Sequence, residues 1–121
     1  MLSIQNEFDP LQHVIVGTGI GMKPEADPAL QQGLPETSAL YTQPDPEATE
    51  HEFEGVCSAL KRHGMLVQRP SIVDSLEVVD QTCPRDIGFV IDGLYFQANS
   101  RYPSRNAEHL GIDPLLAEID R

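Results

Sequence analysis

A charged pair, Arg85 and Asp86, stands directly in front of two apolar segments that are typical of strands. Burying an ion pair at the start of a strand costs free energy unless the charges meet partners, so the pair needs a structural or chemical reason. Cys83 lies two positions earlier and is the nearest side chain with nucleophilic chemistry. These residues are the first candidates for a functional site.

Other chemically capable residues fit structural roles better. The loop Gly17–Met22 has part of the glycine spacing of a dinucleotide-binding turn, but Met22 occupies the third glycine position and Pro24 interrupts the helix that should follow. Cys57 lies on the apolar stripe of a predicted helix, which indicates a core thiol rather than a nucleophile. His51 lacks the second histidine that a zinc helix needs. We therefore expect no cofactor and no metal site.

Net charge and composition limit the classes of binding partner that we expect. Eight basic against 19 acidic residues give a net charge of -11, which disfavours binding to nucleic acid or to anionic membranes. Such a surface would attract a cationic small molecule, but a plain soluble acidic protein is the favoured interpretation of the charge. The sequence shows no signal peptide and no apolar run long enough for a membrane helix, so we expect a cytoplasmic protein with reduced thiols. A disulfide between the two cysteines stays open.

The elements that must position Asp86 follow from hydrophobic spacing and turn residues. We predict an α/β chain of 121 residues in one domain, and the segment 23–44 is an irregular excursion that is either functional or disordered. A helix should begin at the cap Asp45 and end at His63, before Gly64. The predicted strands are, in order, 12–17, 65–68, 87–91 and 94–98, with an Asp92-Gly93 hairpin turn, and a short amphipathic helix should start at Asp113-Pro114 and run to Arg121.

Two linked motifs resemble the amidinotransferases, the family that includes arginine:glycine amidinotransferase. The opening stretch 6–11, followed by the strand 14–17, is similar to the family's N-terminal start. The stretch Cys83-Pro84-Arg85-Asp86, followed by a strand, a turn and a second strand, resembles its first active-site segment. The pair Ser104-Arg105 matches a Ser-Arg pair of the same family. Together the likeness covers nearly the whole chain.

The resemblance implies a fold and a chemistry. The fold is a five-bladed α/β propeller, of which residues 1–70 would form the first module and residues 71–121 the start of the second. The chemistry is attack by a cysteine thiolate on the guanidinium carbon of an arginine-like substrate, with a histidine moving protons. The family's catalytic histidine and cysteine come from later modules, so this chain would carry no catalytic residue. By the same likeness Cys83 is not the nucleophile.

Residue by residue, the resemblance assigns few roles. Asp86 falls on the carboxylate that contacts the substrate guanidinium, and Arg85 falls on an adjoining arginine that would orient Asp86 or form a structural ion pair. Asn6 and Asp9 match the opening motif, where we expect a turn. Ile91 stands where the dimethylarginine hydrolases carry an acidic residue. The stretch 100–103 departs from the transferases' Met-Ala-Trp-Arg, which leaves the acceptor undefined.

Four functional hypotheses remain at this stage. The first is an amidinotransferase-like protein that supplies a substrate-binding aspartate and is inactive alone. The second is a fragment of an arginine hydrolase, either a deiminase or a dihydrolase. The third is a non-catalytic module that forms a homo-oligomer or docks onto a partner completing the propeller, because an open propeller exposes sheet edges and apolar faces. The fourth is a truncated gene product without a selected role.

Overall fold

The computed structural model describes residues 4–6, 8–22, 45–75, 78, 80–100 and 105–119. The predicted excursion 23–44 and the stretch 101–104 lie outside these residues. Along the chain the elements are strand β1, helix α1, strands β2, β3 and β4, and helix α2, with two short 3₁₀ turns. Their bounds are His13–Ile15, Pro46–Arg62, Leu66–Gln68, Gly88–Ile91, Leu94–Gln97 and Asp113–Ile119, and the 3₁₀ turns are Pro84–Asp86 and Glu108–Gly111.

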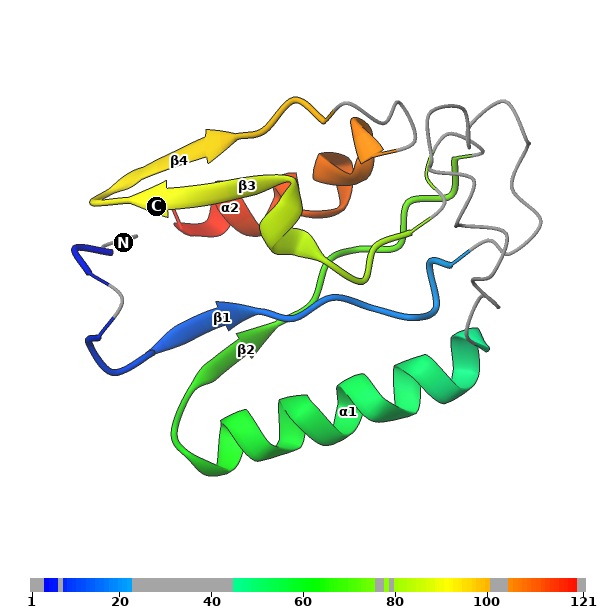
Figure 1. Cartoon of the computed structure of the whole chain (residues 1–121), viewed down its shortest axis with the longest axis horizontal. Helices are drawn as coiled ribbons and strands as arrows, with labels where there is room; N and C mark the ends of the chain where they lie inside the picture. The colour runs from blue at the N-terminus through cyan, green and yellow to red at the C-terminus, as the bar shows by residue number, and fades with distance from the viewer. Residues whose placement is uncertain are drawn as a thin grey trace, which may run out of the picture.

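The first half of the chain is a strand–helix–strand unit. β1 and β2 pair in parallel, with His13 opposite Leu66, and α1 lies along the pair (Figure 1). The side chain of Asp45 accepts a hydrogen bond from the Ala48 amide, and Pro46 takes the first helical position, as the sequence predicts. His63 is the C-terminal cap, and Gly64 has a φ of 83°, which favours glycine.

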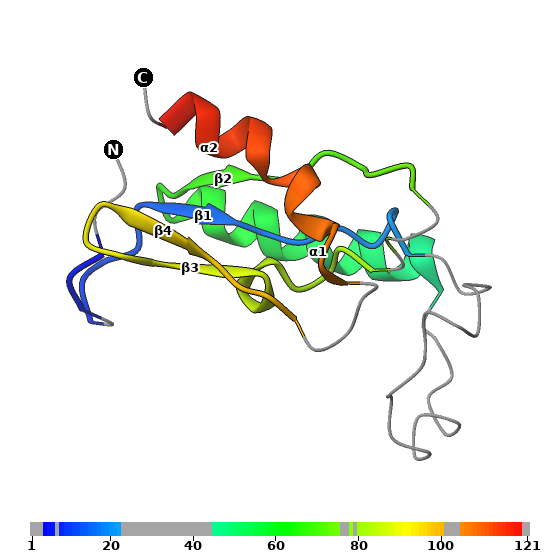
Figure 2. The same ribbon diagram turned by 90° about the horizontal axis from the view of Figure 1, so that it is seen from above.

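The second half of the chain is a hairpin with a helix beside it. β3 and β4 pair antiparallel, with Ile91 opposite Leu94, so Asp92-Gly93 forms the predicted two-residue turn. Asp92 adopts a φ of 51° there, a conformation that aspartate tolerates better than most residues. Figure 2 shows α2 on one side of this hairpin. The α/β class is confirmed, and the strands differ from the predicted bounds by one or two residues at their ends.

A small core holds the two halves together. The backbone of Thr18, beyond β1, pairs with that of Gln81, which leads into the second half. The Gln81 side chain, itself buried, donates to the Ser71 carbonyl and accepts from the Val73 amide. Among the described residues, the buried hydrophobic side chains are few: Val16, Cys57, Val78, Ile87 and Ile112. Stability of the described part therefore depends strongly on polar contacts.

Within the described residues, no helix is long and apolar enough to cross a membrane.

Candidate functional site

Asp86 sits at the end of a 3₁₀ turn and not at the start of a strand. Pro84 fixes the first position of this turn, and the amides of Asp86 and Ile87 donate to the carbonyls of Cys83 and Pro84. The strand β3 begins only at Gly88, so the predicted strand start at Ile87 is wrong by one residue. The turn leaves the Asp86 side chain 44% exposed while Ile87 anchors the core. The carboxylate is thus held by a rigid turn at the surface.

A guanidinium already binds this carboxylate. Nη1 of Arg105 donates to Oδ2 of Asp86 at 2.9 Å. The same side chain donates two hydrogen bonds to Glu108, from Nε to Oε1 at 2.7 Å and from Nη2 to Oε2 at 3.0 Å. Its Nη2 also donates to the Cys83 carbonyl at 3.3 Å. All three guanidinium nitrogens of Arg105 are therefore engaged. We call Asp86, Arg105 and Glu108 the carboxylate–guanidinium cluster.

Burial sets the electrostatics of this cluster. The Glu108 side chain is 1% exposed, and its burial raises the pKa of the carboxyl despite the opposing hydrogen bonds and charge of Arg105. The hydrogen bond to Glu108 is the main cause that raises the pKa of Arg105. Arg105 stays charged at every physiological pH, and it lies between one buried and one half-exposed carboxylate.

Arg85 lies at the edge of the cluster. Its side chain is 91% exposed, and its Nε is 3.5 Å from Oδ1 of Asp86. An exposed pair with this geometry contributes little to stability. Arg105, which the sequence singled out only through the Ser-Arg resemblance, is the arginine that orients Asp86. Glu108 was missed, although an Arg and a Glu three residues apart are a recognisable ion-pair spacing.

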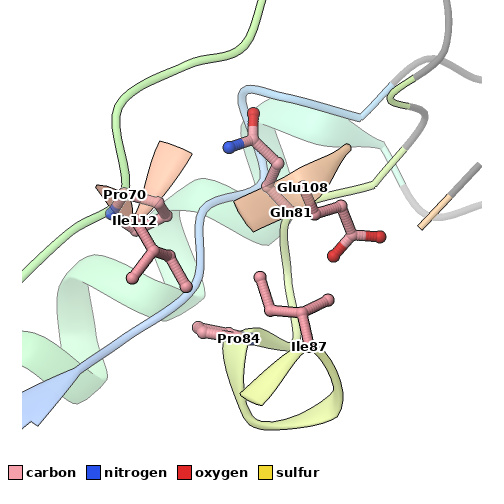
Figure 3. Close-up of a pocket in the computed structure, with 6 residues that line it drawn as sticks. All are labelled: Pro70, Gln81, Pro84, Ile87, Glu108 and Ile112. Carbon is pink, nitrogen blue, oxygen red and sulfur yellow. The ribbon is translucent and has the colours of Figure 1, made fainter. Parts of the chain in front are cut away.

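A small pocket lies beside the cluster (Figure 3). It is lined by Pro70, Gln81, Pro84, Ile87, Glu108 and Ile112. Its cavity volume is about 10 Å³, roughly the room for one water molecule. This pocket is therefore too small for an amino-acid substrate. Any substrate at Asp86 must approach from the exposed side of the 3₁₀ turn.

The opening motif forms the turn that its residues predict. Oδ1 of Asn6 accepts from the amides of Phe8 and Asp9 at 2.8 and 2.9 Å, and its Nδ2 donates to the Asp9 carboxylate at 2.9 Å. These bonds fix Asn6 and Asp9 in an Asx-type turn ahead of β1. Both residues are exposed, and neither contributes to the carboxylate–guanidinium cluster.

The two cysteines differ in exposure and in their contacts. Cys57 is buried on α1, where Nη1 of Arg69 approaches its Sγ at 3.6 Å, and this fits the predicted core thiol. Cys83 is exposed, and the backbone carbonyl rather than the thiol meets Arg105. Both thiols are free, which answers the open disulfide question for this structure. Among the described residues, no group of three or more His, Cys, Asp or Glu side chains is placed to hold a metal.

The glycines of the loop after β1 serve close packing. A Cβ on Gly17 would collide with the Thr82 backbone, and one on Gly19 would lie 2.7 Å from the Glu50 amide. A Cβ on Gly21 would lie 2.6 Å from Oε1 of Gln81. Close packing against the chain itself therefore explains these three glycines.

A second polar cluster ties this loop to α1 and to the residue after β2. Oε2 of Glu50 accepts from the Thr18 hydroxyl and the Gly19 amide, both at 2.8 Å, and Nη2 of Arg69 binds the same carboxylate at 2.8 and 2.9 Å. The Arg69 guanidinium also lies 5.8 Å from the Phe53 ring centre. These contacts join three segments, so we assign the Glu50 cluster a structural role.

Glu50 makes the stability of the chain depend on pH. Burial acts to raise the pKa of its carboxyl, but the hydrogen bonds from Thr18 and Gly19 and the charge of Arg69 outweigh it, so the pKa lies below its ordinary value of 4.5. Its contribution is complete above pH 4.5 and is lost as the pH falls through the lowered pKa. Glu50→Gln should cost about 1–3 kcal/mol at pH 7, and the difference from the unmodified chain should shrink below pH 4.5.

Denaturant titrations between pH 7 and pH 3.5 check this expectation. Glu54→Gln, an exposed change on the same helix, is the control and should stay within about 0.5 kcal/mol of the unmodified chain. A Glu50→Gln difference that is the same at every pH would contradict the assigned role.

Comparison with known proteins assigns the fold to one class. No family model matches the chain. The fold superposes on the solved inosamine-phosphate amidinotransferase of Streptomyces griseus with a TM-score of 0.76 and 28% identity, covering 98% of this chain and 40% of that one. The class is therefore that of an α/β protein built like a segment of an amidinotransferase.

Curated relatives agree with the structural match. A putative inosamine-phosphate amidinotransferase 2 of Streptomyces griseus is 30% identical over 98% of this chain, and inosamine-phosphate amidinotransferase 1 of the same organism is 28% identical. The mitochondrial glycine amidinotransferase of Xenopus laevis is 26% identical over 96% of the chain. These similarities support a segment of amidinotransferase type, and the chain spans 40% of the length of the two Streptomyces relatives and 32% of the Xenopus one.

Proposed function

We propose that the chain forms the guanidinium-binding wall of an amidinotransferase-type site, with Asp86 as the carboxylate that holds the guanidinium of an arginine-like substrate. One observation carries this proposal: Asp86 already accepts a guanidinium N–H at 2.9 Å and remains 44% exposed. A half-exposed carboxylate with one oxygen bound to an internal guanidinium still has lone pairs for a second one. The similarity to amidinotransferases supports group transfer from a guanidine.

Under this proposal, this chain supplies the guanidinium-binding side chains, and segments that it does not span supply the covalent chemistry. Arg105 orients Asp86 through Oδ2, and Arg85, which contacts Oδ1 from the solvent side, is the arginine that an incoming guanidinium would displace. The covalent step of the family, attack by a cysteine thiolate on the guanidinium carbon, would come from segments that this chain does not span. Within the family's proposed five-bladed propeller, residues 1–70 would be the first module and 71–121 the start of the second.

Arginine binding tests the role of Asp86. We expect the chain to bind arginine weakly, with a dissociation constant on the order of millimolar, because one exposed ionic contact supplies little free energy. Asp86→Asn should weaken binding about tenfold or more, since a charge-assisted hydrogen bond contributes about 1.5–3 kcal/mol. Chemical-shift titration by NMR measures both constants and reports at the same time whether the fold persists.

The matched control is Asp9→Asn, a change of the same type at an exposed turn outside the cluster. It should leave the arginine dissociation constant within about twofold, which is less than 0.5 kcal/mol. Equal affinities of the Asp86→Asn variant and the unmodified chain for arginine would reject the assignment.

The hydrolase alternative differs from the transferase in the acceptor of the covalent intermediate. An arginine deiminase or dihydrolase passes the intermediate to water, whereas a transferase passes it to an amine. Cys57 is buried beside Arg69, and Cys83 meets Arg105 only through its backbone carbonyl. We therefore expect the chain to bind arginine without turnover. Release of ornithine, citrulline or ammonia from arginine by the chain alone, with or without glycine, would overturn this view.

A further inference from the structure

Glu108 is an almost fully buried acidic residue next to the proposed guanidinium site. Its side chain is 1% exposed, and glutamate is rarely buried this far unless it is paired. Arg105 supplies the pair, and the Arg105 side chain is itself only 20% exposed. An intact buried ion pair adds little net stability, because both charges lose their hydration. The pair therefore needs a reason besides holding the fold together.

The geometry of Glu108 is that of an ionised carboxylate. Oε1 accepts from Nε of Arg105 at 2.7 Å, and Oε2 accepts from Nη2 at 3.0 Å. A protonated carboxyl would place an O–H on one of these oxygens, where Arg105 offers only N–H donors. Burial raises the pKa of Glu108, with Asp80 and Asp86 adding to the effect, while the hydrogen bonds and charge of Arg105 act against it. Both oxygens are thus bound as in an ionised pair.

The charge of Glu108 matters because Arg105 alone would neutralise Asp86. Nη1 of Arg105 donates to Oδ2 of Asp86 at 2.9 Å, and one carboxylate with one guanidinium is a neutral pair that attracts a second cation poorly. Glu108 binds the other side of the same guanidinium, so the carboxylate–guanidinium cluster keeps one net negative charge. Arg85 changes this balance little, because its side chain is 91% exposed and its charge is screened by solvent.

A neutral acceptor could hold Arg105 in place, as the Cys83 carbonyl does at 3.3 Å, but it could not cancel the charge. We propose that Glu108 is a positioning residue of the guanidinium site, which fixes Arg105 against Asp86 and cancels the Arg105 charge, so that Asp86 stays attractive to an incoming cation. This role rests on the proposed function, because it takes Asp86 as the carboxylate that holds the substrate guanidinium.

Glu108→Gln tests this role, because it keeps the shape of the side chain and removes its charge. At pH 7 we expect the arginine dissociation constant to rise about threefold at an ionic strength of about 0.05 M, where the Debye length exceeds 10 Å. At about 1 M, where that length is about 3 Å, the rise should be less than about 1.5-fold. A loss of shape would weaken binding equally at both salt concentrations. NMR titration measures the constants.

Cys83 offers a second measurement that needs no arginine. It is exposed, and its backbone carbonyl meets Arg105, so its thiol lies next to the cluster, whereas Cys57 is buried. A cationic and an anionic methanethiosulfonate reagent attack the same thiolate, so the ratio of their rates reports the local electrostatic potential. Glu108→Gln should lower the cationic-to-anionic ratio at least about twofold at 0.05 M, because one negative charge is lost.

The double variant Arg105→Gln with Glu108→Gln distinguishes a charged Glu108 from an uncharged one. It leaves no buried charge unpaired, so it also serves if Glu108→Gln alone does not fold. Because one positive and one negative charge are removed together, the ratio of rates at Cys83 should stay within about 1.5-fold of the unmodified chain. If Glu108 carried no charge, the ratio would rise at least about twofold, and that result would overturn the proposed role.

Glu54→Gln is the matched control, because it removes the same charge from an exposed position on α1, outside the cluster. It should change neither the arginine affinity nor the ratio of rates, and circular dichroism should show that every variant is folded. An unchanged ratio in folded Glu108→Gln would overturn the role of Glu108 while arginine binding, and the function proposed for Asp86, persist. Absence of arginine binding to the unmodified chain would instead overturn the proposed function, and the role of Glu108 with it.

Discussion

Arg105→Ala should lower the free energy of unfolding by about 3–5 kcal/mol, the usual cost of removing one partner of a buried ion pair. The substitution leaves the 1%-exposed Glu108 carboxylate without the two hydrogen bonds that compensate its burial. It also leaves Asp86 without its 2.9 Å contact. Denaturant unfolding at pH 7 measures the loss.

Arg85→Ala is the matched control, because the same residue type is removed from the same carboxylate. Arg85 is 91% exposed and 3.5 Å from Asp86, so its loss should change the unfolding free energy by less than about 0.5 kcal/mol. Equal effects of the two substitutions would contradict the arrangement of the cluster. Arg105→Ala combined with Glu108→Gln should recover part of the stability, because the buried charge is removed as well.

Gly17→Ala should destabilise the fold by about 3 kcal/mol or more, at the upper end of the cost of overpacking. The added Cβ would lie 2.8 Å from the Gln81 carbonyl oxygen and would overlap the backbone of Thr82. Backbone atoms in a bridge between two halves of a fold cannot move aside as a flexible side chain does. Thermal and denaturant unfolding both report the effect.

For Gly55→Ala we expect an effect of the opposite sign on the free energy of unfolding. Gly55 lies within α1, and a Cβ there meets nothing within 4 Å. Alanine in an exposed helix interior is favoured over glycine by about 0.8–1 kcal/mol, so this variant should be more stable than the unmodified chain. If Gly17→Ala were as well tolerated as Gly55→Ala, the close approach of the loop to Thr82 would be wrong.

Local sequence rules predicted the elements that depend on local interactions. The cap Asp45, the proline after it and the Asp92-Gly93 turn act through neighbours along the chain, and all three form as expected. Strand ends were less accurate, because tertiary contacts decide where pairing stops. The hub formed by Gln81 could not be predicted, since its partners Ser71 and Val73 become neighbours only once the chain has folded.

The arrangement of side chains around Asp86 was predicted in part. The motif placed Asp86 ahead of the hairpin, where the structure also finds it, but it suggested Arg85 as the associated arginine. The effective partner, Arg105, is 19 residues away from Asp86, and no periodicity connects two residues at that distance. The burial of Glu108 is equally invisible in the sequence, where glutamate is among the residues most often exposed.

The most direct test of the guanidinium-binding role compares arginine with ornithine on the unmodified chain. The two ligands share the amino-acid end, and ornithine carries an ammonium group where arginine carries a planar guanidinium, which alone can form paired hydrogen bonds with a carboxylate. NMR titration should show saturable shifts of the Asp86 and Ile87 amides with arginine and at least fivefold weaker binding of ornithine, a difference of about 1 kcal/mol. Equal responses to the two ligands, or shifts confined to residues away from the 3₁₀ turn Pro84–Asp86, would contradict the assignment of Asp86.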